Sequence, residues 1–327
     1  MTDAALDVVG IGNAIVDIID NTDDDFLQRH GMAKGGMALI DEARAEAIYA
    51  AMGPAIALSG GSAGNTIAGL ASLGARCGYI GKVRDDQLGA VFRHDITAAG
   101  VVFPTAAATS GPATARCLIL VTPDAQRTMN TFLGACVNLT ADDIDEPLIA
   151  SARITYLEGY LYDPPAAQEA FRKAAAVARG AGRRVALSLS DSFCVERHRD
   201  DFLHLMQSVD ILFANESEIT ALFDTDDFDT AIRAVRGRTG LAAITRGAQG
   251  SVVVAGSEVI PVAAARVDRV VDTTGAGDLY AAGFLHGLTT AQALGDCARL
   301  GHLAAAEVIS HFGGRPETPL SEYVARA

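Results

Sequence analysis

The chain has 327 residues, of which 50% are hydrophobic and 20% charged, so it can bury a large core and is not a disordered chain. Its formal net charge is −14, from 26 basic and 40 acidic residues. That charge argues against nucleic acid or a membrane surface as a partner, because either polyanion would repel it.

The expected elements alternate between short apolar strands and longer alanine-rich helices. In chain order they are a strand at 6–12, helices at 66–73 and 168–179, strands at 186–189 and 211–214, a helix at 229–238, a strand at 242–245 and a helix at 279–288. Strand followed by helix implies right-handed βαβ units. We predict an α/β fold with a mostly parallel sheet and helices on both faces, as a single domain over 1–327.

Two segments depart from this alternation. Residues 11–40 are rich in Asp, Gly and Met, and the runs Cys117–Val121 and Thr128–Phe132 flank a turn signal at Thr122–Gln126. The second segment predicts a β-hairpin. If both segments leave the main sheet together, they form a small β lid over the strand ends; we place the lid at about 13–40 and 105–135.

The five cysteines are widely spaced and contain no Cys-x-x-Cys pair, which predicts reduced thiols in the core. Asp3 and Asp7 stand where a secretion signal needs positive charge, and no run of about 18 apolar residues follows. We therefore expect a cytoplasmic protein with no membrane partner.

The strongest chemical signal is Val270-Val-Asp-Thr-Thr-Gly-Ala-Gly-Asp278. The amides of Gly275, Ala276 and Gly277 at a helix N-terminus would bind an anion. Asp278 would lie beside that anion, where its carboxylate could take a proton from an attacking hydroxyl. The simpler alternative is that Asp278 only caps the helix, but a cap seldom needs two glycines, two threonines and a second acid.

Polar residues follow the strands elsewhere, where ligands of such sheets bind. Asn65, after Gly60 and Gly61, offers a donor and an acceptor to a hydroxylated ligand or is an incidental cap. Asp17 could accept hydrogen bonds from a vicinal diol. Ile15 replaces the last glycine of the dinucleotide fingerprint, which disfavours a dehydrogenase.

Two further motifs directly follow predicted strands. Asn215-Glu-Ser-Glu218 could organise a hydrated Mg²⁺, or could be an ordinary acidic helix start. Thr245-Arg-Gly-Ala-Gln-Gly250 offers a hydroxyl and glycine amides to phosphate oxygens, or forms only a tight turn.

Together these motifs resemble the ribokinase-like carbohydrate kinase family, also called PfkB, over essentially the whole chain. The first family signature is matched by Gly60–Asn65 with Asp85–Gly89, and the second by Asp272–Asp278. The N-x-x-E motif is matched by Asn215 and Glu218, and T-x-G-x-x-G by Thr245, Gly247 and Gly250. The resemblance implies a three-layer α/β/α fold with a small β lid.

The resemblance also implies roles for these residues. Asp278 would be the general base, and Gly275, Ala276 and Gly277 would stabilise the transferred phosphoryl group of ATP. Asn215 and Glu218 would hold the water shell of Mg²⁺, and Thr245, Gly247 and Gly250 would contact ATP. The carbonyls of Asp272 and Thr274 match positions that bind a monovalent cation such as K⁺ in many members.

Other residues resemble the adenosine kinase-like branch. Asn13 and Asp17 match its G-N-x-x-x-D opening, and Arg127, after Asp124-Ala-Gln, matches an arginine that reaches the phosphates. Tyr160 falls where that branch stacks an aromatic ring on the base, while Asp17, Gly61 and Asn65 would hold the ribose. Two residues depart from the pattern: His302 replaces the usual Asn near the ATP adenine, and Glu158 could meet a sugar hydroxyl or a different base.

We therefore expect an ATP-dependent nucleoside kinase, with adenosine as the first acceptor and AMP as the product. A sugar kinase acting on ribose or fructose and a catalytically silent nucleotide-binding protein are the alternatives. The sequence leaves monomer and homodimer open.

Overall fold

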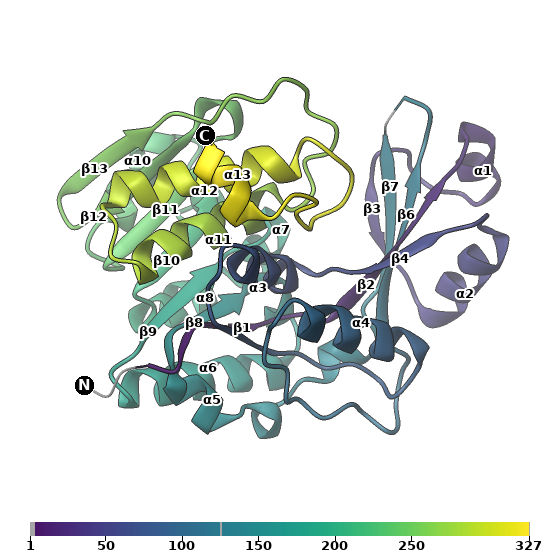
Figure 1. Ribbon diagram of the computed structural model, residues 1–327, viewed down its shortest axis with the longest axis horizontal. Helices are drawn as coiled ribbons and strands as arrows, with labels where there is room; N and C mark the ends of the chain where they lie inside the picture. The colour runs from purple at the N-terminus through teal and green to yellow at the C-terminus, as the bar shows by residue number, and fades with distance from the viewer. Residues whose placement is uncertain (1–3, 125, 327) are drawn as a thin grey trace.

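The computed structural model describes residues 4–124 and 126–326, arranged around two β-sheets (Figure 1). Ala125 of the predicted turn and the extreme ends of the predicted 1–327 domain lie outside the described residues.

The larger sheet has eight strands in the order β13-β12-β11-β10-β9-β8-β1-β5. Its neighbours from β5 to β11 pair in parallel, and β12 and β13 add an antiparallel edge. This arrangement confirms the predicted mostly parallel sheet. Its strands are β1 (Leu6–Ile11), β5 (Cys77–Ile80), β8 (Ala152–Glu158), β9 (Arg184–Ser188), β10 (Ile211–Asn215), β11 (Leu241–Thr245), β12 (Ser251–Ala255) and β13 (Glu258–Val262).

Helices cover both faces of the larger sheet (Figure 1). One buried apolar cluster joins it to α3, α4, α11 and α12, and another joins it to α5–α10. The α-helices are α1 (Asp24–Arg29), α2 (Glu42–Ala51), α3 (Ser62–Ser72), α4 (Gln87–Ala98), α5 (Glu146–Ser151), α6 (Pro165–Gly180), α7 (Ser192–Arg197), α8 (Arg199–Leu205), α9 (Glu216–Leu222), α10 (Phe228–Val235), α11 (Ala276–Thr289), α12 (Leu294–Val308) and α13 (Leu320–Arg326).

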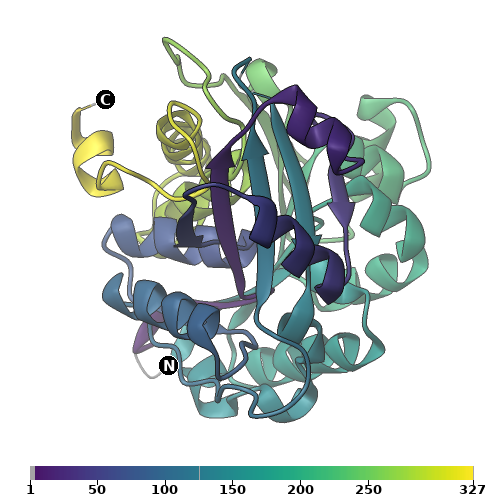
Figure 2. The same cartoon turned by 90° about the vertical axis from the view of Figure 1, so that its right-hand side faces the viewer.

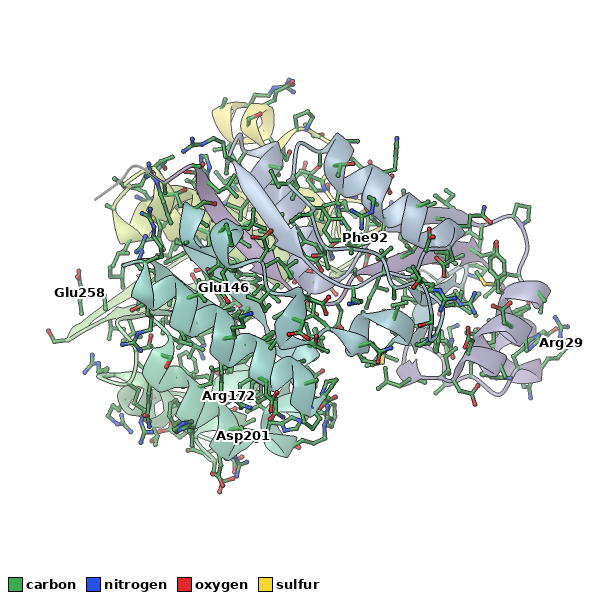
Figure 3. The ribbon with its side chains drawn as sticks, turned by 90° about the horizontal axis from the view of Figure 1, so that it is seen from below. Arg29, Phe92, Glu146, Arg172, Asp201 and Glu258 are labelled. Carbon is green, nitrogen blue, oxygen red and sulfur yellow. The ribbon has the colours of Figure 1, made fainter. Side chains whose placement is uncertain are left out.

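Helical periodicity in the sequence matches the buried stripes of these helices. In α6, Ala167, Ala170, Phe171, Ala174 and Ala178 recur at intervals of three and four residues and are all buried, as expected for a helix with one face on the core. Exposed positions of these helices carry charge: Figure 3 labels Glu146 of α5, Arg172 of α6 and Asp201 of α8, and all three are exposed.

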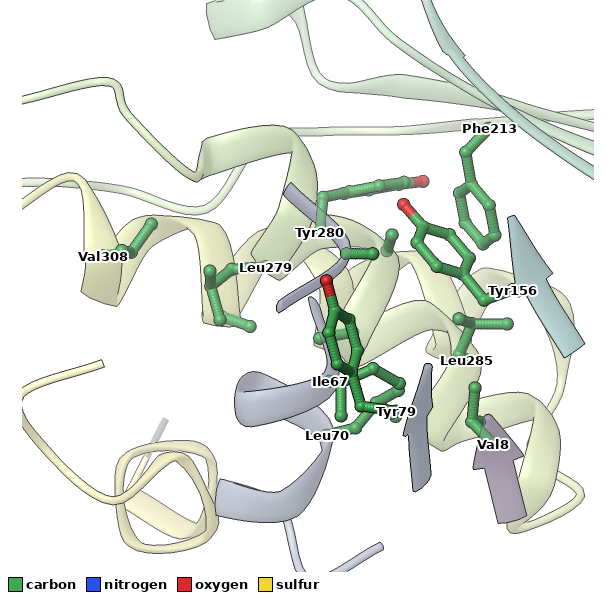
Figure 4. Packing of buried hydrophobic residues seen from close by; sticks show 14 of the residues in the cluster. Val8, Ile67, Leu70, Tyr79, Tyr156, Phe213, Leu279, Tyr280, Leu285 and Val308 are labelled. Atoms are coloured by element: carbon green, nitrogen blue, oxygen red, sulfur yellow. The ribbon is translucent and has the colours of Figure 1, made fainter. Parts of the chain in front are cut away.

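The packing of α11 fixes the position of the predicted anion site. Leu279, Tyr280 and Leu285 lie in one apolar cluster with Ile67 and Leu70 of α3 (Figure 4). The helix begins at Ala276, directly after Gly275, so Asp278 lies in its first turn. Because α3 and α11 are packed against each other, their N-terminal turns are held side by side.

The second sheet, which we call the lid sheet, projects from one end of the molecule (Figure 1) and faces the viewer in Figure 2. Its order is β3-β7-β6-β2-β4. The predicted hairpin is confirmed, because β6 and β7 pair antiparallel with Cys117 opposite Thr131. Its strands are β2 (Ile15–Asn21), β3 (Met37–Leu39), β4 (Ile56–Ser59), β6 (Ala115–Val121) and β7 (Arg127–Phe132).

One strand of the lid sheet lies outside both expected lid segments. Strand β4 pairs antiparallel with β2, with Val16 opposite Ser59. This four-residue edge strand has no alternating pattern of its own, and its first three residues are exposed. Its pairing depends on where β2 lies in space, which no local pattern encodes.

All five cysteines are buried and free, as the spacing predicted. None of the helices in the described ranges is long and apolar enough to cross a membrane.

Candidate active site

A cavity of about 880 Å³ lies between the carboxyl ends of the parallel strands and the lid sheet. The lid contributes mostly apolar side chains to it, among them Ile15, Met37 and Ile119. Most of the predicted site residues line this cavity: Asn13, Asp17, Gly61, Asn65, Tyr160, Asn215, Glu218, Thr245, Gly247, Thr274, Gly275, Ala276, Gly277 and Asp278.

Asp278 is held by the first turn of α3. Its Oδ1 accepts a hydrogen bond from Ser62 Oγ at 2.6 Å, and its Oδ2 accepts one from Asn65 Nδ2 at 3.0 Å. The residue in the N-cap position of α11 is Gly275, which has no capping side chain. The Asp278 carboxylate therefore faces the cavity and α3, and it does not act as the cap of its own helix.

Burial raises the pKa of Asp278, while the hydrogen bonds from Ser62 and Asn65 and the charge of Arg315 lower it. A carboxylate in this environment binds a proton more readily than one in water, as a general base working near neutral pH requires.

The amides before Asp278 form only part of the expected anion site. The Ala276 amide donates to the Thr273 carbonyl at 3.2 Å, so it is already engaged. In the described part of the chain, the amides of Gly275 and Gly277 have no acceptor, and both residues line the cavity. These two amides, at the positive end of α11, can bind an anion.

Asp17 and the loop of Gly60 and Gly61 form one wall of the cavity. Gly61 has φ +83, and a Cβ atom at this position would lie 2.2 Å from the Asn13 carbonyl oxygen, so only glycine allows this close approach. Burial raises the pKa of Asp17 to about 6, although the charges of Arg127 and Arg315 oppose the rise. Asp17 can accept hydrogen bonds from ligand hydroxyls here.

Glu158 is 1% exposed and ties three segments together. Its Oε1 accepts from Asn13 N at 3.2 Å and Asn13 Nδ2 at 2.8 Å, and its Oε2 accepts from Ala63 N at 2.7 Å. Burial raises its pKa to about 7. With its amide nitrogen held by Glu158, Asn13 retains a buried Oδ1 that has no partner among the described residues. Asn13 therefore offers the cavity an acceptor.

Asn215 and Glu218 form a capping box at the start of α9. The Asn215 Oδ1 accepts from Glu218 N at 2.9 Å, and Glu218 Oε2 accepts from Asn215 N at 2.9 Å. Burial raises the pKa of Glu218 to about 7. The Asn215–Glu218 motif is thus the start of a helix, as one of its two interpretations predicted. The Glu218 carboxylate nevertheless lines the cavity.

This arrangement fits a hydrated Mg²⁺. No group of three or more metal-binding side chains occurs in the described residues. The Glu218 carboxylate at the cavity wall would face the ion. Mg²⁺ keeps several waters and is usually bound through one or two carboxylates and the phosphates of a substrate.

Four predicted residues do not line the cavity: Arg127, Asp272, Gly250 and His302. The Arg127 side chain is 8% exposed and pairs with the Asp272 carboxylate and Thr274 Oγ1 behind the anion site. Hydrogen bonds from the Thr274 amide and Arg127 outweigh the effect of burial and lower the pKa of Asp272.

The other two residues, His302 and Gly250, are held by contacts with β12 and β13. His302 is buried on α12, where its Nε2 lies 2.9 Å from Ser251 Oγ; its contact with ATP stays a prediction. A Cβ atom at Gly250 would lie 2.1 Å from the Val262 carbonyl oxygen. Gly250 therefore shapes the turn before β12, and its contact with ATP stays a prediction.

Two contributors were missed by the sequence analysis. Ser62 stands inside the recognised Gly60–Asn65 motif, and its place one residue after Gly61 is the signal that could have identified it. Arg315 donates from Nε to Asn65 Oδ1 at 3.1 Å; it lies 250 positions from Asn65, and no local pattern marks it.

Comparison with known proteins agrees with this geometry. A family profile described as pfkB family carbohydrate kinase matches residues 57–320. The chain belongs to this family. It is a phosphotransferase that acts on an alcohol group, with a ribokinase-like α/β fold.

Solved structures of two bacterial pfkB kinases are similar over nearly the whole chain. An adenosine kinase from Sinorhizobium meliloti is 53% identical, with a TM-score of 0.92 over 99% of each chain. A probable sugar kinase from Rhizobium etli is 49% identical, with a TM-score of 0.93 over 99% of this chain and 98% of that one. The Saccharomyces cerevisiae adenosine kinase is 26% identical over 94% of this chain and 95% of its own length.

Proposed function

We propose that this pfkB kinase transfers the γ-phosphoryl group of ATP to the 5′-hydroxyl of a nucleoside, with adenosine first, to give ADP and AMP. The observation that carries the proposal is the Asp278 carboxylate, held by Ser62 and Asn65 beside the unpartnered amides of Gly275 and Gly277. The 53% identity to the S. meliloti adenosine kinase supports a nucleoside as acceptor.

Asp278 would take the proton of the acceptor hydroxyl as its oxygen attacks the γ-phosphorus and the bond to the β-phosphate oxygen breaks. The Gly275 and Gly277 amides would stabilise the charge on the transferred group. Because phosphoryl transfer depends chiefly on positioning, the rigid contact between α3 and α11 supplies much of what this step needs.

The acceptor would lie between the strand ends and the lid sheet. Asp17 and Asn65 would bind the ribose hydroxyls, and the free Oδ1 of Asn13 would accept from a further donor of the nucleoside. Tyr160 is 42% exposed at the cavity wall, which leaves its ring open to stack on a base.

ATP would occupy the part of the cavity near Asn215, Thr245 and Gly247. Glu218 would hold the water shell of Mg²⁺, which supplies positive charge to the phosphates when bound. That charge matters here, because Asp17, Glu158, Glu218 and Asp278 all repel an anion. The carbonyls of Asp272 and Thr274 are proposed to bind K⁺ on family resemblance alone.

A sugar kinase is the second candidate. The R. etli probable sugar kinase is almost as similar as the adenosine kinase, at 49% identity. Asp17 and Asn65 would also suit the hydroxyls of a free sugar, in which case the space beside Tyr160 would remain empty.

The experiment is a panel of acceptors with purified protein and Mg²⁺–ATP: adenosine, inosine, guanosine, ribose and fructose. We expect adenosine to give the highest kcat/KM and AMP as the product. Turnover of free sugars only would replace the nucleoside proposal with the sugar kinase, and no turnover of any acceptor would favour a silent nucleotide-binding protein.

The matched control is Asp278→Asn, which keeps the size of the side chain and removes the base. It should bind ATP and acceptor and lose at least roughly 10²-fold in kcat. A near-normal kcat in this variant would remove Asp278 from the role of base whatever the acceptor.

A further inference from the structure

Arg315 lies between α12 and α13 and reaches back to the first turn of α3. Its Nε donates to Asn65 Oδ1 at 3.1 Å. A Cβ atom at Gly64 would lie 3.3 Å from its Nη2, so the guanidinium packs directly on the helix. Within the described residues, this buried Nη2 has no hydrogen-bond partner.

The contact determines which way the amide of Asn65 faces. A carboxylate only accepts and a guanidinium only donates. With Asp278 on one side and Arg315 on the other, the Nδ2 of Asn65 must face Asp278 and its Oδ1 must face Arg315, as observed. A flipped amide would set two acceptors against each other at Asp278 and two donors at Arg315.

Backbone packing holds the same arrangement. A Cβ atom at Gly314 would lie 2.5 Å from Asn65 Nδ2, and one at Gly275 would lie 2.7 Å from the Gly314 Cα. The segment 313–315 therefore touches both the amide of Asn65 and the start of the anion site, which leaves Asn65 little room for another rotamer.

The charge of Arg315 also acts on the Asp278 carboxyl group. Asp278 is faced by acidic groups from several elements: Asp17 on β2, Glu158 on β8 and Glu218 on α9. Tyr156 and Tyr160 also face it. The Arg315 charge lowers the pKa of Asp278.

We propose that Arg315 is a positioning residue for the kinase reaction, which fixes the amide of Asn65 toward Asp278 and places its positive charge near that carboxylate. The inference deepens the proposed function and rests on it, because it assumes that Asp278 is the base. Arg315 does not line the cavity, so it acts through Asn65 and through its charge.

The test measures kcat and the pH dependence of kcat/KM, from about pH 5 to 9, for Arg315→Gln and Arg315→Lys with the acceptor that the wild type uses best. Arg315→Gln should lower kcat between roughly 10- and 100-fold and move the acid limb of the profile to higher pH. Arg315→Lys keeps the charge and should leave the acid limb in place while kcat still falls. In an Asn65→Ala background, Arg315→Gln should lower kcat by less than about threefold, because the two residues act as one unit.

The control is Arg93→Gln. Arg93 is also partly buried and donates to the carbonyls of Phe103 and Thr105, away from Asp278. A purely structural Arg315 would behave like Arg93, with lower stability, unchanged kcat and an unmoved acid limb, and that result would overturn the inference. Fully additive effects of Arg315→Gln and Asn65→Ala on kcat would also overturn the inference.

If the Arg315→Gln variant does not fold, the Arg315→Lys variant provides the test. An unchanged kcat in Arg315→Lys then overturns the inference. Failure of the proposed function is a separate outcome, because turnover of free sugars only, or of no acceptor, shows in the wild type before any variant is measured.

Discussion

At the residue scale, the cavity is lined by carboxyl groups whose charged forms are disfavoured by burial. Burial raises the pKa of Asp17 to about 6 and those of Glu158 and Glu218 to about 7. Such groups reduce the stability of the folded chain at neutral pH, and their concentration around one cavity is typical of a functional site.

Glu158 allows this loss of stability at neutral pH to be measured. Burial raises the pKa of Glu158 from its ordinary 4.5 to about 7 in the folded protein. The folded state binds the Glu158 proton more tightly than the unfolded state does. The stabilisation of the folded state by this proton is therefore complete below pH 4.5 and is lost as the pH rises through 7. Relative to Glu158→Gln, the wild type should lose up to about 3 kcal/mol of unfolding free energy over that range, at about 1.4 kcal/mol per pKa unit.

Urea denaturation at about pH 4.5 and pH 8 checks this prediction. Glu169→Gln is the control, because Glu169 is exposed on α6 and its loss should leave the pH dependence unchanged. Parallel pH profiles for wild type and Glu158→Gln would contradict the assigned shift.

At the element scale, the start of α11 depends on two glycines for different reasons. Gly275 has φ +76 and lies against Gly314, whereas a Cβ atom at Gly277 would meet nothing within 4 Å. Gly275 is therefore required by the backbone, and Gly277 leaves room at the cavity wall for a bound anion.

Substitution by alanine at Gly275 and at Gly277 distinguishes these two roles. Gly275→Ala should lower the unfolding free energy by more than about 1 kcal/mol, because a side chain in the left-handed region is strained. Gly277→Ala should keep the wild-type stability or raise it by up to about 1 kcal/mol, yet lower kcat because its methyl group enters the anion site. Thermal unfolding and steady-state kinetics distinguish the two; equal stability losses would refute the assignment.

At the scale of the whole molecule, Arg127 joins the lid sheet to the main body. It lies on β7 and pairs with Asp272, which precedes the anion site. In the part of the chain that the structure describes, the buried Nε and Nη2 of Arg127 have no hydrogen-bond partner; its contact with a phosphate, as the family resemblance implies, stays a prediction.

Arg127→Met tests this link. Removing one partner leaves the Asp272 carboxylate buried without its counter-charge, so we expect a loss of about 3 kcal/mol in stability and a fall in kcat of at least roughly 10-fold. The matched control is Arg116→Met, because Arg116 is a buried arginine on the neighbouring strand β6 that pairs with Glu46 of α2 near the lid sheet. Equal effects of both variants on kcat would show that the pair with Asp272 has no special role.

The sequence by itself determined the class of fold and several polar residues of the cavity wall. Strand periods and the loops that follow them were sufficient, because parallel strands bring their carboxyl ends to one edge of a sheet. Asp17, Asn65, Glu218 and Asp278 could therefore be placed together from local patterns, whereas Asn13 was added by the family resemblance.

Only the tertiary structure decided how those residues are held. Ser62 and Asp278 are 216 positions apart, and Arg315 and Asn65 are 250 apart. The pairing of Arg127 with Asp272 and the burial of His302 beside Ser251 likewise join distant segments. Such contacts depend on the packing of α3, α11 and the lid sheet, and a local pattern encodes which face a residue presents but not which distant residue meets it.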